Sequence, residues 1–293
     1  MREFKKKGLH LSSGDLEVSR RELLQNTILA GSAFALAVSG SHALAESASP
    51  DHGQVNPASE TELDSIGQSI EARIQAEVEA APIERYAELL DLTNLNGEST
   101  GYCKVFKGDK LAKGSMFSMS IPPVGRYFNI HLIPDARYRI PRFSYEGMLT
   151  SRGSQCSIDL YPDRDVVMDL VDFEDQYQGV AKIYAQAQKN ELIQWQPAEQ
   201  AFLRAIFSPF ALLSFTIPGA GLGAMEGYAD GYFSEWLKMY AAGQENSAAE
   251  TAYVTKRRAR MKEVMRARDP NVEGVIAVYG EEKTRAIQDA TLL

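Results

Sequence analysis

Residues 134–146 read PDARYRIPRFSYE and place one carboxylate among aromatic and aliphatic side chains. Pro134 and Pro141 exclude a helix through this stretch and favour extended backbone in the residues before them. The stretch therefore predicts a strand, a turn and a second strand that contains Glu146. Because side chains alternate along a strand, Glu146 shares one face with Ser144. Glu146 is our leading candidate for a functional acid, and the alternative is a solvent-facing glutamate on an edge strand.

Short apolar segments continue on both sides of this stretch. Between residues 101 and 170 they are joined by short connections that contain Gly, Pro and Asp. Connections this short leave no room for crossover helices, so we expect an antiparallel sheet of about six strands. The predicted strands cover residues 102–106, 115–121, 126–133, 142–149, 155–161 and 166–170.

Apolar residues recur at helical spacing in the rest of the chain. Helices before and after a contiguous antiparallel sheet predict an α+β fold, here a three-layer α/β/α sandwich. A strand-like run at residues 210–217 interrupts the second helical region. The predicted helices cover residues 60–92 with a break at Pro82, 173–190, 198–207, 224–242, 248–268 and 281–291.

The 293-residue chain has a formal net charge of −8 and a hydrophobic content of 44%. These values fit one globular domain, which we expect to span residues 59–293. The acidic balance argues against a nucleic-acid partner. Residues 46–58 are polar and rich in small residues and proline, so they predict a flexible linker ahead of the domain.

The first 45 residues resemble a twin-arginine export signal. A basic start precedes Arg20 and Arg21, and the apolar run at residues 27–40 is too short to cross a membrane. Ala43 and Ala45 are the small residues that a signal peptidase requires, so we expect cleavage before residue 46 and no stable membrane insertion afterwards. The alternatives are an amphipathic helix or a general secretory signal.

This export signal predicts that the protein resides in a periplasm or a thylakoid lumen. If the signal is not used, we expect the protein in the cytoplasm or the plastid stroma. Cys103 and Cys156 are the only cysteines, so a metal site built on thiolates is poorly supported. In an oxidising compartment the two cysteines could pair, and the alternative is that both are free and buried.

Several short motifs resemble one enzyme superfamily. The spacing Pro134-x-x-x-Tyr138-x-x-Pro141-x-Phe143-x-x-Glu146 is similar to the segment by which ferredoxin-dependent bilin reductases present an acid to a linear tetrapyrrole. Those enzymes typically carry aspartate in the last position, and glutamate there resembles the related red chlorophyll catabolite reductases. Three other stretches agree in order and spacing: Tyr177-Gln178, residues 202–209 (FLRAIFSP) and residues 279–282 (YGEE).

The resemblance implies an antiparallel sheet, an open pocket between this sheet and the C-terminal helices, and no bound metal, flavin or nicotinamide. It also implies that reduced ferredoxin delivers electrons one at a time to a linear tetrapyrrole. The first expected reaction is the conversion of red chlorophyll catabolite into primary fluorescent chlorophyll catabolite. The sequence has no Gly-x-Gly-x-x-Gly motif at a strand-to-helix junction and no phosphate loop, which is consistent with this expectation.

Two acids are the expected catalytic residues. Reduction of a conjugated tetrapyrrole produces an anion radical that must be protonated, and a partly buried Glu146 would be protonated near neutral pH. Asp269 occupies the position of the C-terminal aspartate of the reductases. It shares a helix face with Arg258, Lys262 and Arg266, which should keep it ionised. The alternative for Asp269 is a helix-ending Asp-Pro turn.

The same three basic residues, Arg258, Lys262 and Arg266, are the predicted docking site for pigment carboxylates or for the acidic ferredoxin. The alternative is a solvated helix face. An overall acidic protein needs such a local positive patch in order to bind an acidic electron donor. A homodimer is also possible.

Four further residues are expected to bind the substrate. Asn129 stands where biliverdin-reducing members have a catalytic histidine, and His131 projects to the same strand face two residues later. Phe207, followed by Ser208, matches a phenylalanine that lines the pocket of chlorophyll catabolite reductases. The alternatives are a structural role for His131 and core packing for Phe207. The absence of histidine at position 129 disfavours biliverdin as the substrate.

The export signal and the expected electron donor are in tension, because ferredoxin is not expected in a bacterial periplasm. Glu146 and Asp269 favour an enzyme of the red chlorophyll catabolite reductase kind, which is the first hypothesis. An exported, noncatalytic tetrapyrrole-binding protein or a reductase of another bilin is the alternative.

Overall fold

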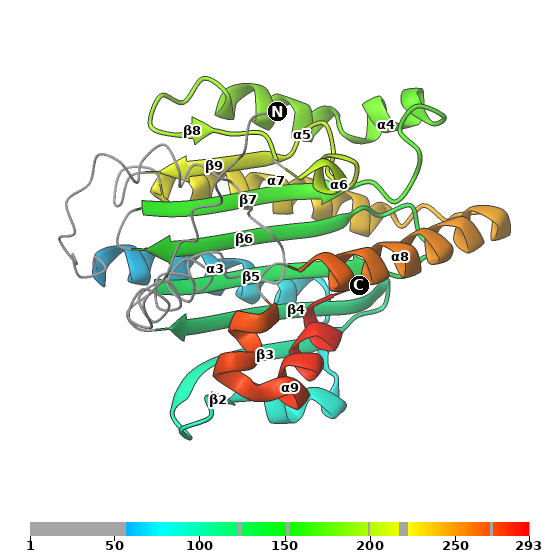
Figure 1. Cartoon of the computed structure of the whole chain (residues 1–293). Coiled ribbons are helices and arrows are strands. Elements are labelled where there is room, and N and C mark those ends of the chain that lie inside the picture. Colours follow the sequence, from blue (N-terminus) through cyan, green and yellow to red (C-terminus); the bar gives the residue numbers. More distant parts are fainter. Residues whose placement is uncertain are drawn as a thin grey trace, which may run out of the picture.

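The computed structural model describes residues 57–292, except residues 122–124, 151–152, 199, 217–221 and 270–271 (Figure 1). The predicted export signal and nearly all of the predicted linker lie outside the described residues. The described helices are α3 (Pro57–Glu77), the 3-10 helix η1 (Glu84–Leu90), α4 (Leu170–Gln176), α5 (Gln178–Ala187), α6 (Ala201–Arg204), α7 (Leu222–Ala242), α8 (Ala248–Arg268) and α9 (Val272–Thr291).

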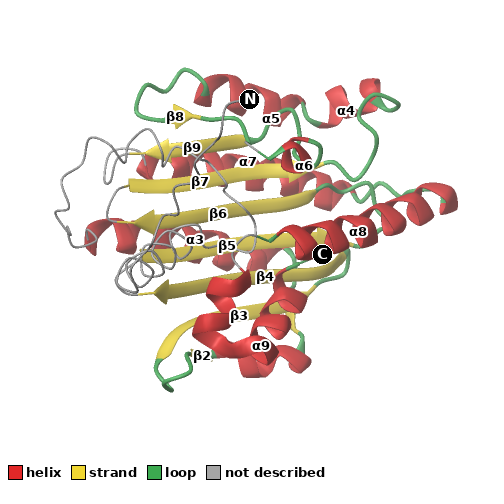
Figure 2. Ribbon diagram, in the orientation of Figure 1, coloured by secondary structure: helices red, strands yellow, loops and turns green. Residues whose placement is uncertain are grey.

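One antiparallel sheet organises the described part of the chain. Nine strands form it in the order β1-β3-β4-β5-β6-β7-β9-β8, and β2 pairs with β3 outside this path. Figure 2 shows helices on both sides of the sheet. The strands are β1 (Ala81–Pro82), β2 (Leu92–Thr93), β3 (Ser99–Lys107), β4 (Leu111–Ile121), β5 (Gly125–Pro134), β6 (Arg142–Thr150), β7 (Gly153–Tyr161), β8 (Gln194–Trp195) and β9 (Leu212–Thr216).

The predicted α+β class and the antiparallel sheet are confirmed, but about six strands was too few. The missed strands β1, β2 and β8 have two residues each, which is too short to show an alternating pattern. The run at residues 210–217 joins the sheet as β9. Two-residue strands therefore cannot be predicted from sequence patterns, even where they form part of the sheet.

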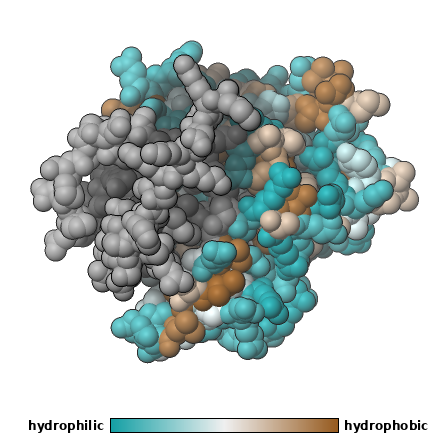
Figure 3. Space-filling model, viewed as in Figure 1, coloured by the Kyte–Doolittle hydropathy of each residue, from teal (hydrophilic) through white to brown (hydrophobic). Residues whose placement is uncertain are grey.

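The strand predicted at residues 166–170 is wrong. The Asp165 carboxylate accepts hydrogen bonds from the backbone N–H groups of Val167 and Met168, which turns the chain into α4. Val167, Met168 and Val171 are about 80% exposed, at 82%, 81% and 79%. Figure 3 shows this apolar patch at the edge of the molecule over α4. An apolar run alone therefore did not indicate burial here.

The back face of the sheet holds the larger core, covered by α3, α5 and α7 (Figure 1). Trp236 of α7 is fully buried and donates a hydrogen bond from its indole nitrogen to the backbone oxygen of Pro141, at 2.8 Å. Phe233, one turn earlier, packs edge-on against Phe143 with ring centroids 5.4 Å apart. The proline-bounded stretch is thus fixed from behind by aromatic packing and by one buried hydrogen bond.

The front face is covered by η1, α8 and α9 (Figure 1). The helix α9 bends at Gly280, whose φ of 78° and ψ of 166° are not helical and favour glycine. Tyr279 and Ile287, on either side of this bend, pack with the front-face side chains Phe117 and Tyr127. The bend directs the last turns of α9 across the middle of the sheet.

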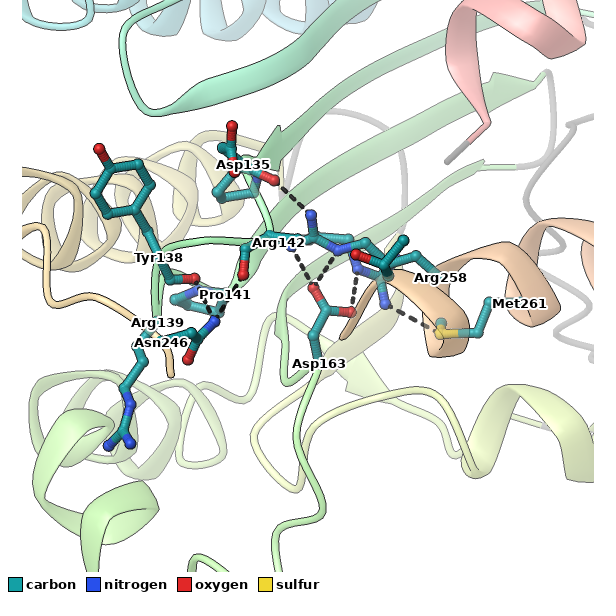
Figure 4. A network of polar contacts seen from close by, with 12 residues as sticks. Asp135, Tyr138, Arg139, Pro141, Arg142, Asp163, Asn246, Arg258 and Met261 are labelled. Atoms are coloured by element: carbon teal, nitrogen blue, oxygen red, sulfur yellow. Dashed lines mark hydrogen bonds and ion pairs between the residues drawn. The ribbon is translucent and has the colours of Figure 1, made fainter. Parts of the chain in front are cut away.

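The turn between β5 and β6 is tied to the segment that precedes α8 (Figure 4). The Asn246 amide donates to the backbone oxygens of Ala136 and Tyr138, and the backbone N–H of Arg139 donates to Gln244. These bonds fix the direction in which residues 134–146 enter the sheet.

Beside this turn, Asp163 is buried between two arginines (Figure 4). Arg142 and Arg258 contact its two carboxylate oxygens at 2.9 Å and 2.6 Å. Burial would raise the pKa of Asp163, but the two guanidinium groups outweigh it and hold that pKa below its ordinary value. This ion triad attaches α8 to the start of β6, and its members compensate one another's buried charge.

Cys103 and Cys156 are free and buried. Cys103 belongs to the front core and Cys156 to the back core, so the sheet lies between them. The disulfide that the sequence left open does not form, and the alternative of two free, buried thiols is confirmed.

Candidate functional site

Polar side chains occupy the centre of the front face, where four strands meet. One cross-strand row joins Ser115, His131, Ser144 and Asp159 on β4, β5, β6 and β7. In the next row Asn129 and Ser157 flank Glu146. All of these side chains are buried. A buried polar floor is costly unless its members bind one another or a ligand, so this floor is the candidate functional site.

Glu146 and His131 form the central pair. The Glu146 Oε1 atom lies 3.1 Å from His131 Nε2, and His131 Nδ1 lies 3.1 Å from the backbone oxygen of Thr291. A carbonyl oxygen only accepts, so Nδ1 carries the hydrogen and donates to Thr291. The Nε2 atom therefore faces Glu146 either as an acceptor for a protonated carboxyl or as the N–H of an imidazolium. In both cases one proton lies between the two side chains.

The second carboxylate oxygen of Glu146 faces Tyr127. The Tyr127 hydroxyl donates to Glu146 Oε2 at 3.4 Å and accepts from the Asn129 amide nitrogen at 2.8 Å. The Asn129 Oδ1 atom is buried without a hydrogen-bond partner. An unsatisfied buried acceptor beside an acid is a suitable place for the N–H group of a ligand.

Burial raises the pKa of Glu146 above its ordinary value, and the hydrogen bonds with His131, Tyr127 and Ser144 oppose part of this rise. The carboxyl group is only 2% exposed. A buried carboxyl with a raised pKa keeps its proton at higher pH than a free glutamate does, which suits a proton donor.

Sequence reasoning missed Asp159, which lies on β7 and faces the same side as Glu146. Its carboxylate accepts from the backbone N–H of Ser208 at 2.9 Å and from the Ser208 hydroxyl at 2.5 Å. Tyr161, two residues later, stacks on Phe207 with ring centroids 5.4 Å apart. The alternation of residues 155–161 could have placed Asp159 on the front face, had it been compared with that of β6.

Both predicted residues contact the front face of the sheet. Phe207 stacks on Tyr161, and Ser208 binds Asp159 of the polar floor. Phe207 is half-buried, whereas Ser208 is buried. Contact with a pigment stays a prediction for both residues.

Asp269 is the residue at which α8 ends. This position agrees with the alternative given above, in which Asp269 ends a helix. Its carboxylate accepts a hydrogen bond from the Gln288 amide of α9 at 3.3 Å. Lys262 contacts Asp289 at 3.7 Å and Arg266 also contacts Asp289, whereas Arg258 binds Asp163. The catalytic role of Asp269 stays a prediction.

The docking role of Arg258, Lys262 and Arg266 also stays a prediction, but the three side chains differ in exposure. The Arg258 side chain is 11% exposed, while those of Lys262 and Arg266 are 29% and 41% exposed. Because a docking residue must be reached from solvent, Lys262 and Arg266 are the more suitable pair.

The space beside the Glu146–His131 pair is closed. A cavity of about 10 Å³ lies among His131, Ser144, Tyr161 and Thr291, which is room for about one water molecule. Leu292 is fully buried, and Lys113 donates to the backbone oxygens of Asp289 and Leu292. The resemblance implied an open pocket between the sheet and the C-terminal helices, whereas here the end of α9 occupies that position.

The described residues contain no group of three or more His, Cys, Asp or Glu side chains arranged to hold a metal ion. None of their helices is both long enough and apolar enough to span a membrane.

Comparisons with known proteins support the fold. No protein-family model matches the sequence, and no curated protein matches it either. The crystal structure of phytochromobilin synthase from tomato in complex with biliverdin matches with a TM-score of 0.67 and 15% sequence identity, over 77% of this chain and 80% of that one. A structure of PcyX matches over 77% of this chain and 94% of that one, at a TM-score of 0.40 and 11% identity. The first of these two matches shows that the described part of the chain shares its α+β fold with tomato phytochromobilin synthase.

Proposed function

We propose that this protein reduces a linear tetrapyrrole by one-electron transfers from reduced ferredoxin, with Glu146 as the proton donor. The observation that carries the proposal is the buried Glu146–His131 pair on the sheet of a fold that binds biliverdin in tomato phytochromobilin synthase. Red chlorophyll catabolite is the proposed substrate, because glutamate rather than aspartate occupies the acid position of the motif.

The residues of the floor supply what such a reduction requires. Reducing one double bond consumes two electrons and two protons. The electrons come from ferredoxin, and Glu146 gives a proton to the carbon that has gained electron density. His131 holds that proton next to the Glu146 carboxyl until it is needed. The unpartnered Asn129 Oδ1 atom can accept a hydrogen bond from a pyrrole N–H, which would orient the pigment.

A pigment of four rings needs far more room than the present cavity offers. The segment after Gly280 is therefore proposed to move away from the sheet when the pigment binds. Gly280 already has a backbone conformation that differs from the rest of α9, so a change of direction there breaks few helical hydrogen bonds.

The test mixes the full-length protein anaerobically with red chlorophyll catabolite and chemically reduced ferredoxin, and a parallel reaction contains biliverdin. We expect a colourless fluorescent product from the chlorophyll catabolite and slower or no change of biliverdin. Conversion of biliverdin alone would replace the proposed substrate with another bilin. If a pigment binds tightly and neither is reduced, the enzyme proposal is wrong and the noncatalytic tetrapyrrole-binding protein takes its place.

Location is a separate proposal. If the predicted export signal directs the protein to a periplasm, another one-electron reductant must replace ferredoxin. A reporter fused behind residues 1–45 with the Arg20-Arg21 pair changed to Lys-Lys would test this. Unchanged export of the reporter would contradict the twin-arginine assignment.

A further inference from the structure

The last turn of α9 is bound to the front face of the sheet through its backbone oxygens. The oxygen of Thr291 accepts a hydrogen bond from His131 Nδ1 at 3.1 Å. The oxygens of Asp289 and Leu292 both accept from the Lys113 ammonium group, the first at 2.9 Å. Carbonyl oxygens at the end of a helix have no partner within the helix, so donors from the sheet complete this one.

The side chain of the same turn points to α8. The Asp289 carboxylate lies 3.7 Å from Lys262 Nζ and also pairs with the Arg266 guanidinium (Figure 1). Lys262 and Arg266 are the two predicted docking residues that solvent reaches, since Arg258 is nearly buried on Asp163. In the closed structure, both accessible cations therefore already face a carboxylate of their own chain.

These two sets of contacts belong to one short helical segment. The chain is helical from residue 281 to residue 291, after the bend at Gly280, and the backbone N–H of Leu292 still donates to Gln288 at 2.9 Å. A helical segment of this length moves as a unit, because its own hydrogen bonds hold it together. A displacement that uncovers His131 therefore also withdraws Asp289 from α8.

Resting on the proposed function, we propose that Lys262 and Arg266 form the docking surface for an acidic ferredoxin and that Asp289 occupies this surface until pigment displaces the end of α9. Carboxylates of the ferredoxin then take the place of the Asp289 carboxylate. Pigment and ferredoxin both bind better when the end of α9 is displaced. By linkage, each must raise the affinity for the other by the same factor. The electron donor thus docks preferentially on protein that already holds an electron acceptor.

The size of this coupling follows from the exposure of the ion pairs. Asp289 is 54% exposed, and pairs between exposed side chains contribute little because water and salt screen them. Two cations are released together, however, and each is then free for the partner. We therefore expect a coupling at the low end of the usual range, about fivefold.

A purely structural explanation also exists, in which Asp289 only attaches α9 to α8. It predicts that pigment leaves the affinity for ferredoxin unchanged. A second alternative is that any loss of negative charge favours an acidic partner. Asp230→Asn controls for this, because Asp230 is a 53% exposed carboxylate on α7, at the back of the sheet, and pairs with Arg73 at 2.6 Å. The two variants change the net charge equally.

The first experiment needs no pigment. Isothermal titration calorimetry measures the binding of oxidised ferredoxin to the full-length protein. We expect Asp289→Asn to bind ferredoxin about fivefold more tightly than the wild type, because the docking cations no longer face a carboxylate. Asp230→Asn should match the wild type. Equal affinities of the two variants, or no binding by either of them, would overturn the inference.

The second experiment measures the coupling itself. Saturating red chlorophyll catabolite should raise the affinity of the wild type for ferredoxin about fivefold and that of Asp289→Asn by less. Hydrogen exchange gives a readout that a local ion pair would not change. Ferredoxin alone should speed exchange of the backbone amides at residues 286–292 and leave those of α7 unaltered. Ferredoxin that binds without this change would contradict the proposed linkage.

These outcomes also separate the two levels of the proposal. Pigment that is reduced while the affinity for ferredoxin stays the same with and without pigment refutes the role of Asp289 and leaves the proposed function intact. A protein that neither binds nor reduces pigment refutes the proposed function. In that case the comparison of Asp289→Asn with Asp230→Asn still decides whether Asp289 occupies the docking surface.

Discussion

The two faces of the sheet are formed by the same strands and are both buried, but burial has a different effect on each face. Along β6 the back face carries Phe143 and Tyr145, which pack on the aromatic side chains of α7. The front face of the same strand carries Ser144 and Glu146, which bind polar neighbours and lie beneath the end of α9. Burial on the back face removes apolar surface from water. Burial on the front face instead changes the proton affinity of carboxyl groups.

The comparison indicates a division of labour within one sheet. A continuous aromatic core behind the strands stabilises the fold, so the front face can hold polar groups whose burial is costly. The α7 layer should therefore control stability, and the α9 layer should control chemistry. The predictions below test this division of roles.

The largest expected effect is on the back face. Trp236→Ala removes the largest fully buried side chain and leaves the Pro141 oxygen without its donor. We expect the free energy of unfolding to fall by about 3–5 kcal/mol. Urea denaturation followed by circular dichroism measures this change. Tyr253→Ala, at a 47% exposed aromatic of α8, is the control and should cost about 0.5 kcal/mol or less. Similar losses in both variants would contradict the assignment of the main core to α7.

The next effect is on the front face. Glu146→Gln keeps the shape of the side chain but removes its transferable proton. We expect pigment turnover to fall by about 10²–10⁴-fold, because a positioned general acid contributes on that order. Pigment binding, followed by absorbance, should persist, and the urea midpoint should shift little, in contrast to Trp236→Ala. Retained full turnover would remove Glu146 from its proposed role.

The third prediction concerns pH and stability. Burial raises the pKa of Asp159 from 3.8 to about 6 in the folded protein, so the folded state binds its proton more tightly than the unfolded state does. The resulting stabilisation is fully present below the unfolded pKa near 4 and is lost as pH rises through about 6. Two pKa units correspond to at most about 3 kcal/mol.

Asp159→Asn should therefore flatten the wild-type decline in unfolding free energy over this pH range. Asp289→Asn, which changes a half-exposed carboxylate at the end of α9, is the control and should leave the decline in place. A wild-type stability that does not fall between pH 4 and pH 6 would contradict the raised pKa of Asp159.

The smallest effect is expected at the surface of α8. Arg266→Ala breaks a contact with Asp289 in which both side chains are about half exposed, so stability should change by about 1 kcal/mol or less. Association with ferredoxin should weaken and become less sensitive to salt if Arg266 docks an acidic partner. Surface plasmon resonance at two salt concentrations measures this. An unchanged salt dependence would remove Arg266 from the docking surface.

Sequence alternation predicted the face of Glu146 correctly, because a period of two holds along any paired strand. It also placed His131 on that face, two residues after Asn129. It gave no sign that His131 binds the backbone of Thr291, since that contact joins positions 160 residues apart and depends on how α9 packs. The closure of the site over Glu146 was missed for the same reason. Local patterns report the side of a strand that a residue faces, but not what covers it.

Each of the two free thiols can report how often the layer of helices above it opens. Cys103 lies beneath the front layer and Cys156 beneath the back layer, and burial raises the pKa of both thiols to about 12. A thiol in that state reacts with a labelling reagent only after its layer has opened. The modification rates of Cys103 and Cys156 thus time the opening of each layer separately, without any introduced label. Pigment binding that displaces the end of α9 should change the Cys103 rate and leave the Cys156 rate unaltered.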